Sequence, residues 1–179
     1  MSQSGQPIDT TVRTGTPGLD ELLCGGLTAN RMYLIEGAPG TGKTTLALKF
    51  LLEGRERGES TLYVTLSETE AELTAIARSH GWTLDNIGLF QLASSEGLKP
   101  EDQYTLYHPA EVELGETVKA VLQTMEQQRP TRVVFDSLSE LKLLARDPLR
   151  YRRQILAFKE FFAGRDCTVL MLEIGRAHV

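Results

Sequence analysis

Eight consecutive residues have the types and the order that bind phosphate groups. They fit the pattern G-x-x-x-x-G-K-[ST] and are Gly37, Ala38, Pro39, Gly40, Thr41, Gly42, Lys43 and Thr44. The glycines allow positive φ and close backbone approach, so successive N–H groups can turn inward around phosphate oxygens. A helix that begins near Lys43 would add unpaired amides and the positive end of its dipole. The pattern predicts a loop that binds a nucleoside triphosphate, and we include the next residue, Thr45, among its binding residues.

The last two residues of this octapeptide have separate predicted roles. Lys43 would contact the β- and γ-phosphates as a catalytic point charge, and the Thr44 hydroxyl would bind a Mg²⁺ ion that bridges the same phosphates. The flanking residues support this prediction, because an apolar run precedes the loop and residues 43–57 follow it with helical spacing. A glycine-rich turn that binds nothing is the alternative, but such a turn does not need lysine followed by threonine.

A carboxylate that could hold the same metal ion follows a second apolar run. Mg²⁺ keeps several waters, and an acidic side chain at the end of a neighbouring buried strand usually holds one of them. Asp136 ends such a run at 132–136, and we predict that it binds the metal through a water molecule. The alternative is that Asp136 only caps the helix that follows it. Because the phosphate loop is already present, we favour the metal site.

The composition is that of an ordinary globular domain. The chain has 179 residues, of which 41% are hydrophobic and 24% charged, and this length suffices for a sizeable core. It has no signal-peptide core at its start and no apolar run near the roughly 18 residues of a membrane span. Its two cysteines, Cys24 and Cys167, lack metal-binding spacing and indicate a reducing compartment. We expect a cytoplasmic protein without a membrane partner.

The charge balance argues against general binding to nucleic acid without excluding it. The net charge is −5 and the isoelectric point is about 5.3, whereas nucleic-acid-binding domains are usually basic. One basic cluster departs from this balance and consists of Lys142, Arg146, Arg150, Arg152 and Arg153. We favour a solvated helix face for this cluster. A subunit contact and a phosphate-facing edge are the open alternatives.

Apolar periodicity alternates strands and helices along the chain. Strands are expected at 32–36, 61–66, 88–92, 132–136 and 167–172, and helices at 17–24, 43–57, 69–80, 110–128 and 148–164. Gly81 is well placed as the left-handed residue that ends the third helix. This alternation predicts an α/β fold with a parallel sheet that is covered by helices on both faces.

Three segments carry no functional argument. Residues 1–11 are expected to be a disordered leader, and 93–109 a surface connection, in which a tyrosine could stack on a purine. The last seven residues, 173–179, look like the translation of a common sequencing adapter. We therefore expect one incomplete domain over 12–172 that is truncated at its carboxyl end.

With the loop and the Asp136 strand in place, the chain resembles the KaiC-like branch of the RecA-type ATPases. The segments that carry the resemblance are a leader before the loop, a second strand with an acidic end, and a magnesium-binding strand, at 14–27, 63–68 and 132–138. The resemblance covers roughly residues 12–172. Within the leader, Cys24 stands where relatives tend to have glycine.

The resemblance implies a P-loop NTPase with a RecA-like three-layer sandwich and a mainly parallel central sheet. It also implies that ATP lies between adjacent subunits of a homo-oligomeric ring, commonly a hexamer, and that a cation from the neighbour completes the site. A carboxylate at the end of the second strand positions the attacking water in this family. Relatives often carry two adjacent glutamates there, whereas this chain has Ser67 and then Glu68. Glu68 is therefore the candidate base, and a surface glutamate that caps the next helix is the alternative.

We expect Mg²⁺-dependent ATP hydrolysis that serves as a conformational switch or signalling motor, with ATP and Mg²⁺ as cofactors. In-line attack by water needs charge neutralisation on the γ-phosphate more than covalent chemistry. Two alternatives use the same core: a DNA recombination, repair or helicase-type ATPase, and a slow-turnover autokinase or regulatory scaffold. Nothing in the sequence identifies a pocket that distinguishes ATP from GTP.

Overall fold

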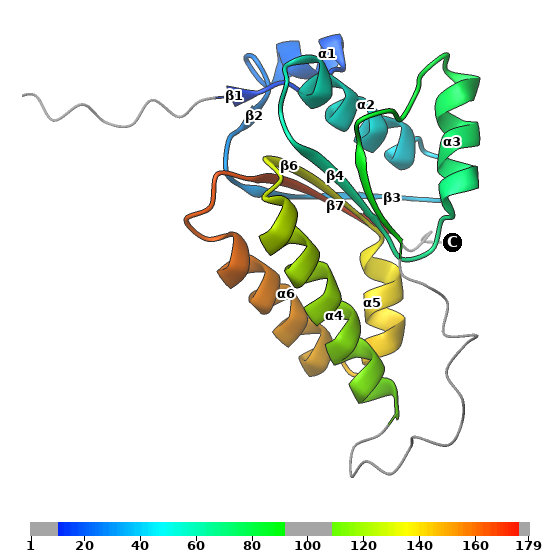
Figure 1. Ribbon diagram of the computed structural model, residues 1–179, viewed down its shortest axis with the longest axis vertical. Helices are drawn as coiled ribbons and strands as arrows, with labels where there is room; N and C mark the ends of the chain where they lie inside the picture. Colours follow the sequence, from blue (N-terminus) through cyan, green and yellow to red (C-terminus); the bar gives the residue numbers. More distant parts are fainter. Residues whose placement is uncertain (1–10, 92–108, 176–179) are drawn as a thin grey trace, which may run out of the picture.

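A five-stranded parallel sheet forms the centre of the structure (Figure 1). The structure is a computed structural model that describes residues 11–91 and 109–175. Of the three segments without a functional argument, residues 1–10, 93–108 with Tyr104 and Tyr107, and 176–179 lie outside the described residues. Thr11 lies in a short strand, Pro109 begins a helix, and residues 173 and 174 end a strand.

The strands of this sheet are short, largely apolar runs, as parallel strands buried on both faces require. They are β3 (Met32–Gly37), β4 (Thr61–Thr65), β5 (Gly88–Gln91), β6 (Arg132–Asp136) and β7 (Thr168–Ile174). They pair in the order β3-β7-β6-β4-β5, and every pair is parallel. The predicted strands are therefore confirmed. In the described part of the chain β3 lies at one edge of this sheet, with the Leu34 side chain 56% exposed.

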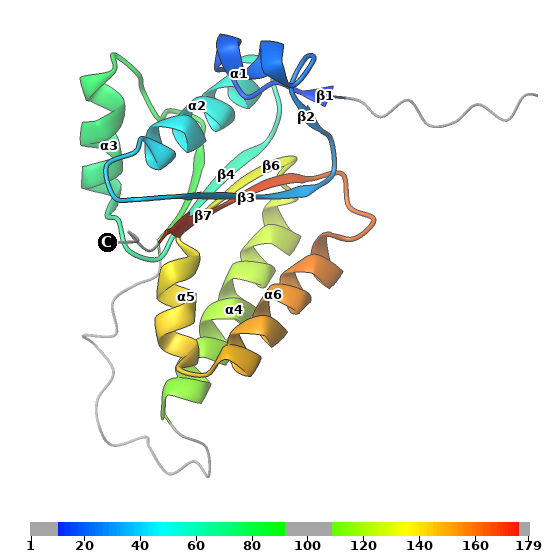
Figure 2. The ribbon, with the colours of Figure 1, turned by 180° about the vertical axis from the view of Figure 1, so that it is seen from behind.

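Helices cover both faces of the sheet, which confirms the RecA-like α/β sandwich. One face carries α1 (Pro17–Leu22), α2 (Lys43–Glu56) and α3 (Glu70–Ser79), and the other carries α4 (Pro109–Gln128), α5 (Leu138–Ala145) and α6 (Pro148–Phe162) (Figures 1 and 2). Two buried clusters match these layers, one around Phe50 and Tyr63 and the other around Phe135 and Phe158. None of the helices in the described residues is long and apolar enough to cross a lipid bilayer.

Helix α5 was not predicted from the sequence. It has eight residues and directly follows β6, with buried side chains at Leu138, Leu141 and Ala145. So short an apolar run does not distinguish a helix from other buried structure by periodicity alone. The N-cap position of α5 is Ser137, so the alternative role of Asp136 as a helix cap is not what the structure shows.

Residues 11–28, which include the leader at 14–27, form a small unit in which helix α1 lies between two short strands in the sequence. Strands β1 (Thr11–Val12) and β2 (Leu27–Thr28) pair antiparallel. The buried Asp20 carboxylate accepts hydrogen bonds from the Thr14 amide at 2.7 Å and the Thr14 hydroxyl at 2.8 Å. Cys24 has a φ of 53°, a left-handed conformation that glycine adopts without strain. This conformation explains why glycine is suited to the Cys24 position.

The first residue of β6 fastens both the leader and α2 to the sheet. The Arg132 side chain is 1% exposed and forms a two-point ion pair with Glu59, at 2.6 and 2.8 Å. Its guanidinium also donates to the backbone carbonyls of Arg13 at 2.6 Å and Phe50 at 3.0 Å. Arg132 therefore joins three segments that are far apart in sequence.

Replacing Gly54 with alanine is expected to destabilise the domain by about 1–2 kcal/mol. A Cβ on Gly54 would lie 2.6 Å from Cδ and 2.7 Å from Nε of the buried Arg132 side chain, and such overpacking typically costs about 1–3 kcal/mol. This loss exceeds the helix-propensity gain of roughly 0.5–1 kcal/mol. The matched control is Gly115→Ala in α4, where a Cβ meets nothing within 4 Å. Urea unfolding should show opposite shifts for the two variants, and equal shifts would contradict the prediction.

Candidate functional site

The predicted phosphate loop connects the end of β3 to the start of α2. Gly40 and Gly42 have φ angles of 79° and 86°, and Gly42 is the N-cap residue of α2. Gly37 permits a close approach, because a Cβ there would lie 2.7 Å from Thr41 Oγ1. Left-handed glycines followed by a helix N-terminus form a concave set of amides that favours anions. The loop therefore has the local geometry of a phosphate site.

The Lys43 side chain folds back along this loop. Its Nζ donates to the carbonyl oxygens of Gly37 at 2.8 Å and Ala38 at 2.9 Å. The Thr41 hydroxyl donates to the same Ala38 oxygen at 2.9 Å. The ammonium is thus held beside the exposed turn of Ala38, Pro39 and Gly40, where a polyphosphate could replace the carbonyls as its partner.

Thr44 connects the phosphate loop to Asp136. The Thr44 hydroxyl donates to Asp136 Oδ2 at 3.3 Å, and Asp136 is only 7% exposed. The expectation that Asp136 would end a strand next to β3 was wrong, because β7 lies between β3 and β6. The two groups still meet because α2 packs across the sheet and contacts β3, β7, β6 and β4. Thr45, the next residue of this helix, is half-buried.

Burial dominates the electrostatics of Asp136. Loss of solvent raises the pKa of this carboxyl above its usual range, while hydrogen bonds from Tyr63 and Thr44 act in the opposite direction. The charged form is therefore stabilised by few, specific donors in place of bulk water. A nearby cation would stabilise the ionised form of such a buried carboxylate.

The side chains at this point fit Mg²⁺. Mg²⁺ prefers oxygen ligands and is usually bound by one or two protein groups together with waters and substrate phosphates. Thr44 and Asp136 offer a hydroxyl and a carboxylate beside the predicted phosphate loop. In the described ranges no three His, Cys, Asp or Glu side chains gather into a metal cage. A hydroxyl and a carboxylate are the kind of donors that a Mg²⁺ ion shared with a nucleotide would use.

Glu68 lies beyond the end of β4, at the same edge of the sheet. The turn from Thr65 to Glu68 is closed by two hydrogen bonds, in which the Thr65 hydroxyl donates to the Glu68 carbonyl at 2.8 Å and accepts from the Glu68 amide at 2.9 Å. Burial raises the pKa of the Glu68 carboxyl, and the charges of Glu72, Asp136 and Glu140 raise it further. The negative charge of Asp136 therefore acts on the Glu68 carboxyl.

Helix capping after β4 is carried by other residues. The N-cap residue of α3 is Thr69, whose hydroxyl accepts from the Glu72 amide while Glu72 accepts from the Thr69 amide. The alternative reading of Glu68 as the helix cap is therefore not seen. Because β4 ends at Thr65, the alternation of side chains along a strand does not decide the direction of Glu68.

Sequence reasoning missed one residue that touches this site. Tyr63 in β4 donates from its hydroxyl to Asp136 Oδ2 at 2.5 Å. Alternation of side chains along a strand offered part of the information, because residues two apart on a strand point to the same face. Tyr63 is in register with Val134 and Thr65 with Asp136, so Tyr63 and Asp136 share a face of the sheet. The pairing of β4 with β6, however, is a tertiary contact that the local pattern does not contain.

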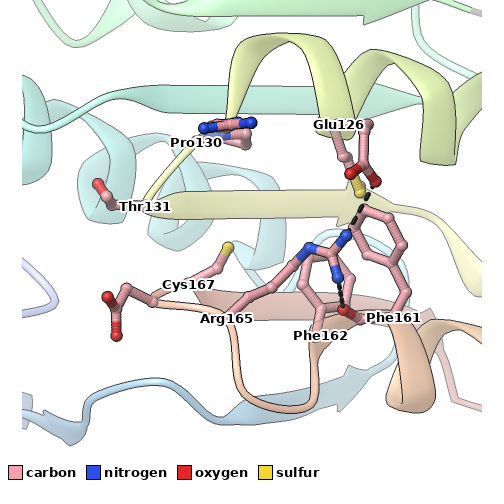
Figure 3. Close-up of a pocket in the computed structure, with 10 residues that line it drawn as sticks. Glu126, Pro130, Thr131, Phe161, Phe162, Arg165 and Cys167 are labelled. Carbon is pink, nitrogen blue, oxygen red and sulfur yellow. Dashed lines mark hydrogen bonds and ion pairs between the residues drawn. The ribbon is translucent and has the colours of Figure 1, made fainter.

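A separate pocket of about 410 Å³ lies at the amino-terminal ends of strands β6 and β7, whereas the phosphate loop follows the carboxyl end of β3 (Figure 3). It is lined by residues that include Thr131 before β6 and Cys167 before β7. Arg165 stacks on the Phe161 ring at 3.9 Å and pairs with Glu126 at 2.9 Å. No residue of the predicted phosphate loop lines this pocket. We therefore place the candidate site at the loop, where the chemistry of the side chains converges.

A parallel sheet whose edge strand runs through a glycine loop into a helix, with a buried aspartate meeting that helix, defines a P-loop nucleotide-binding protein. The family described as "ATPase: KaiC" matches residues 12–176 of this chain. The chain therefore belongs to the KaiC family of ATPases and carries a nucleotide-binding ATPase domain of this type.

Similar proteins include several from archaea and bacteria. A UPF0273 protein of Pyrococcus horikoshii is 31% identical over 167 residues, which cover 90% of this chain and 67% of that protein. A UPF0273 protein of Thermotoga maritima is 30% identical, with 90% and 68% covered. A UPF0273 protein of Pyrobaculum aerophilum is 33% identical, with 90% and 59% covered. The chain thus spans about two thirds or less of the length of these relatives.

Proposed function

We propose that this protein binds ATP with Mg²⁺, hydrolyses the γ-phosphate and uses the cycle as a conformational switch or signalling motor. The observation that carries the proposal is the contact between Thr44 and Asp136 at 3.3 Å. It joins a phosphate loop to a buried carboxylate that comes from a distant part of the chain. A glycine-rich turn without a ligand would not require this contact.

Each proposed role follows from the chemistry of the side chain. Lys43 would neutralise charge on the β- and γ-phosphates, and Thr44 with Asp136 would hold Mg²⁺, Asp136 through a water molecule. The metal would supply charge neutralisation at the phosphates. Glu68, whose raised pKa suits a base, would orient and deprotonate the attacking water.

We also propose a homo-oligomeric ring in the cytoplasm, in which a neighbouring subunit completes the site with a cation. Support for the ring comes from the KaiC family match. Support for a reducing compartment comes from Cys24 and Cys167, which are both free thiols.

Nucleotide binding is tested most directly by replacing Lys43. Lys43→Ala is expected to weaken ATP binding about 30-fold, since hydrogen bonds to charged groups contribute roughly 1.5–3 kcal/mol. The measurement is a titration with a fluorescent ATP analogue in the presence of Mg²⁺, together with phosphate release. Lys159→Ala, an exposed lysine near the end of α6, removes the same charge elsewhere and should bind as the unaltered protein does. Equal affinity in both variants would sink the assignment.

A further inference from the structure

We propose that Tyr63 is a positioning residue for the metal-binding carboxylate. Its buried phenol holds Asp136 in the orientation that receives Mg²⁺. This inference rests on the proposed function and assigns a role to a residue outside the phosphate loop and outside the predicted site.

The placement of Tyr63 follows from the sheet. Strands β4 and β6 are parallel neighbours, with Tyr63 opposite Val134 and Thr65 opposite Asp136. Side chains two residues apart on a strand share a face, so Val134 and Asp136 lie on the face that is covered by α2 and α3. The Tyr63 ring is packed there with Leu48 and Leu73 and is 1% exposed. The ring therefore has little freedom to point its hydroxyl elsewhere.

The hydrogen bonds define which carboxylate oxygen is held. Tyr63 Oη donates to Asp136 Oδ2 at 2.5 Å, and Thr44 Oγ1 donates to the same oxygen at 3.3 Å. An ionised carboxylate has two oxygens with about four acceptor positions. With both hydroxyls on Oδ2, Asp136 is anchored through one oxygen, and Oδ1 is not engaged by either of them. Thr44 is itself a proposed metal ligand, so Tyr63 is the anchor that would stay in place when the metal binds.

The chemistry of the phenol suits this role. Burial first, and then the charge of Asp136, raise the pKa of the Tyr63 hydroxyl, so Tyr63 is a permanent donor. Groups that hydrogen-bond a metal-binding side chain fix its orientation, and their loss typically weakens metal affinity by about 10–100-fold. Because Asp136 is proposed to act through a water, we expect an effect at the low end, about tenfold.

The test removes one oxygen atom from a buried ring. Tyr63→Phe keeps the aromatic packing and deletes the hydrogen bond to Asp136. Tyr33→Phe is the matched control, because the Tyr33 hydroxyl donates to the backbone carbonyl of Thr28 at 2.9 Å, away from the site. Binding of a fluorescent ATP analogue is titrated at a series of Mg²⁺ concentrations and in EDTA. The readout is the Mg²⁺ concentration that gives half of the metal-dependent change in affinity.

The expected result separates metal binding from nucleotide binding. In EDTA all three proteins should bind the analogue within about twofold of one another. The half-saturating Mg²⁺ concentration should rise about tenfold in Tyr63→Phe and stay within twofold in Tyr33→Phe. An unchanged or lowered value in Tyr63→Phe would overturn the positioning role while leaving ATP binding intact. Absence of nucleotide binding by the unaltered protein would overturn the proposed function, and this inference with it.

A second background guards against a folding defect. Asp136→Asn removes the negative charge to which the phenol donates. The double variant Tyr63→Phe/Asp136→Asn therefore contains no buried carboxylate that has lost its hydrogen-bond donor. In this background the loss of the Tyr63 hydroxyl should change the Mg²⁺ dependence by less than twofold. A further tenfold change would show that Tyr63 acts by a route other than Asp136 and would overturn the proposal.

Discussion

Replacing Glu68 with glutamine is expected to lower the rate of ATP hydrolysis at least 100-fold while nucleotide affinity stays within about threefold. General acid–base catalysis contributes typically about 10²–10⁴-fold, and glutamine keeps the shape of the side chain but accepts no proton. Glu68 is the carboxylate beyond β4 whose pKa is raised by burial and by Glu72, Asp136 and Glu140. The measurement is steady-state phosphate release at saturating ATP and Mg²⁺.

The pH dependence of the rate provides a second readout of Glu68. A base works only when it is deprotonated, so the rate should fall as the pH drops through the pKa of Glu68. Because that pKa is raised, the fall should begin at a higher pH than an ordinary glutamate would give. Glu70→Gln is the matched control, since Glu70 is exposed in the first turn of α3. Equal rates for the Glu68 and Glu70 variants would remove Glu68 from the mechanism.

Replacing Arg132 with methionine is expected to destabilise the domain by about 3–5 kcal/mol. Removing one partner of a buried ion pair typically has this effect, and in this pair the Arg132 side chain is 1% exposed and that of Glu59 30%. Here the change also deprives the backbone carbonyls of Arg13 and Phe50 of their guanidinium donor. For a domain of this size, about 1 kcal/mol shifts Tm by roughly 2–4 °C, so a fall in Tm of about 10 °C is expected by differential scanning calorimetry.

A surface arginine provides the comparison for Arg132. Arg165 also pairs with a glutamate and stacks on a phenylalanine ring, but the Arg165 and Glu126 side chains are 42% and 61% exposed. Exposed pairs contribute roughly 0–1 kcal/mol, so Arg165→Met should change Tm by only a few degrees. If the two methionine variants unfold at the same temperature, Arg132 does not fasten the leader and α2 as described.

Much of the fold could be predicted because its signals are local. The glycine loop, the apolar strand runs and the left-handed Gly81, with a φ of 73°, are each contained in a few neighbouring residues. Helix α5 was missed because its eight residues are too few to display a period. The strand order was also beyond the local pattern, so the insertion of β7 between β3 and β6 was not foreseen.

The candidate site likewise contains residues that the sequence predicted and contacts that it did not. The sequence motif contains Lys43 and Thr44, and an apolar run with a terminal carboxylate identified Asp136. The hydrogen bond from Tyr63 to Asp136 joins residues 73 positions apart, and the fastening of Arg132 to Arg13 joins residues 119 positions apart. Such contacts arise only after the strands have paired, so no reading of neighbouring residues contains them.

The border position of β3 affects the colloidal behaviour of the described domain. A border strand offers a row of backbone amides and carbonyls to any extended chain that comes near, and native sheets usually blunt such rows with charges, prolines or a covering element. Residues 32–35 carry neither a charge nor a proline. Solubility at high concentration therefore depends on what shields β3, and the same holds for β5 at the other edge of the sheet in the described residues.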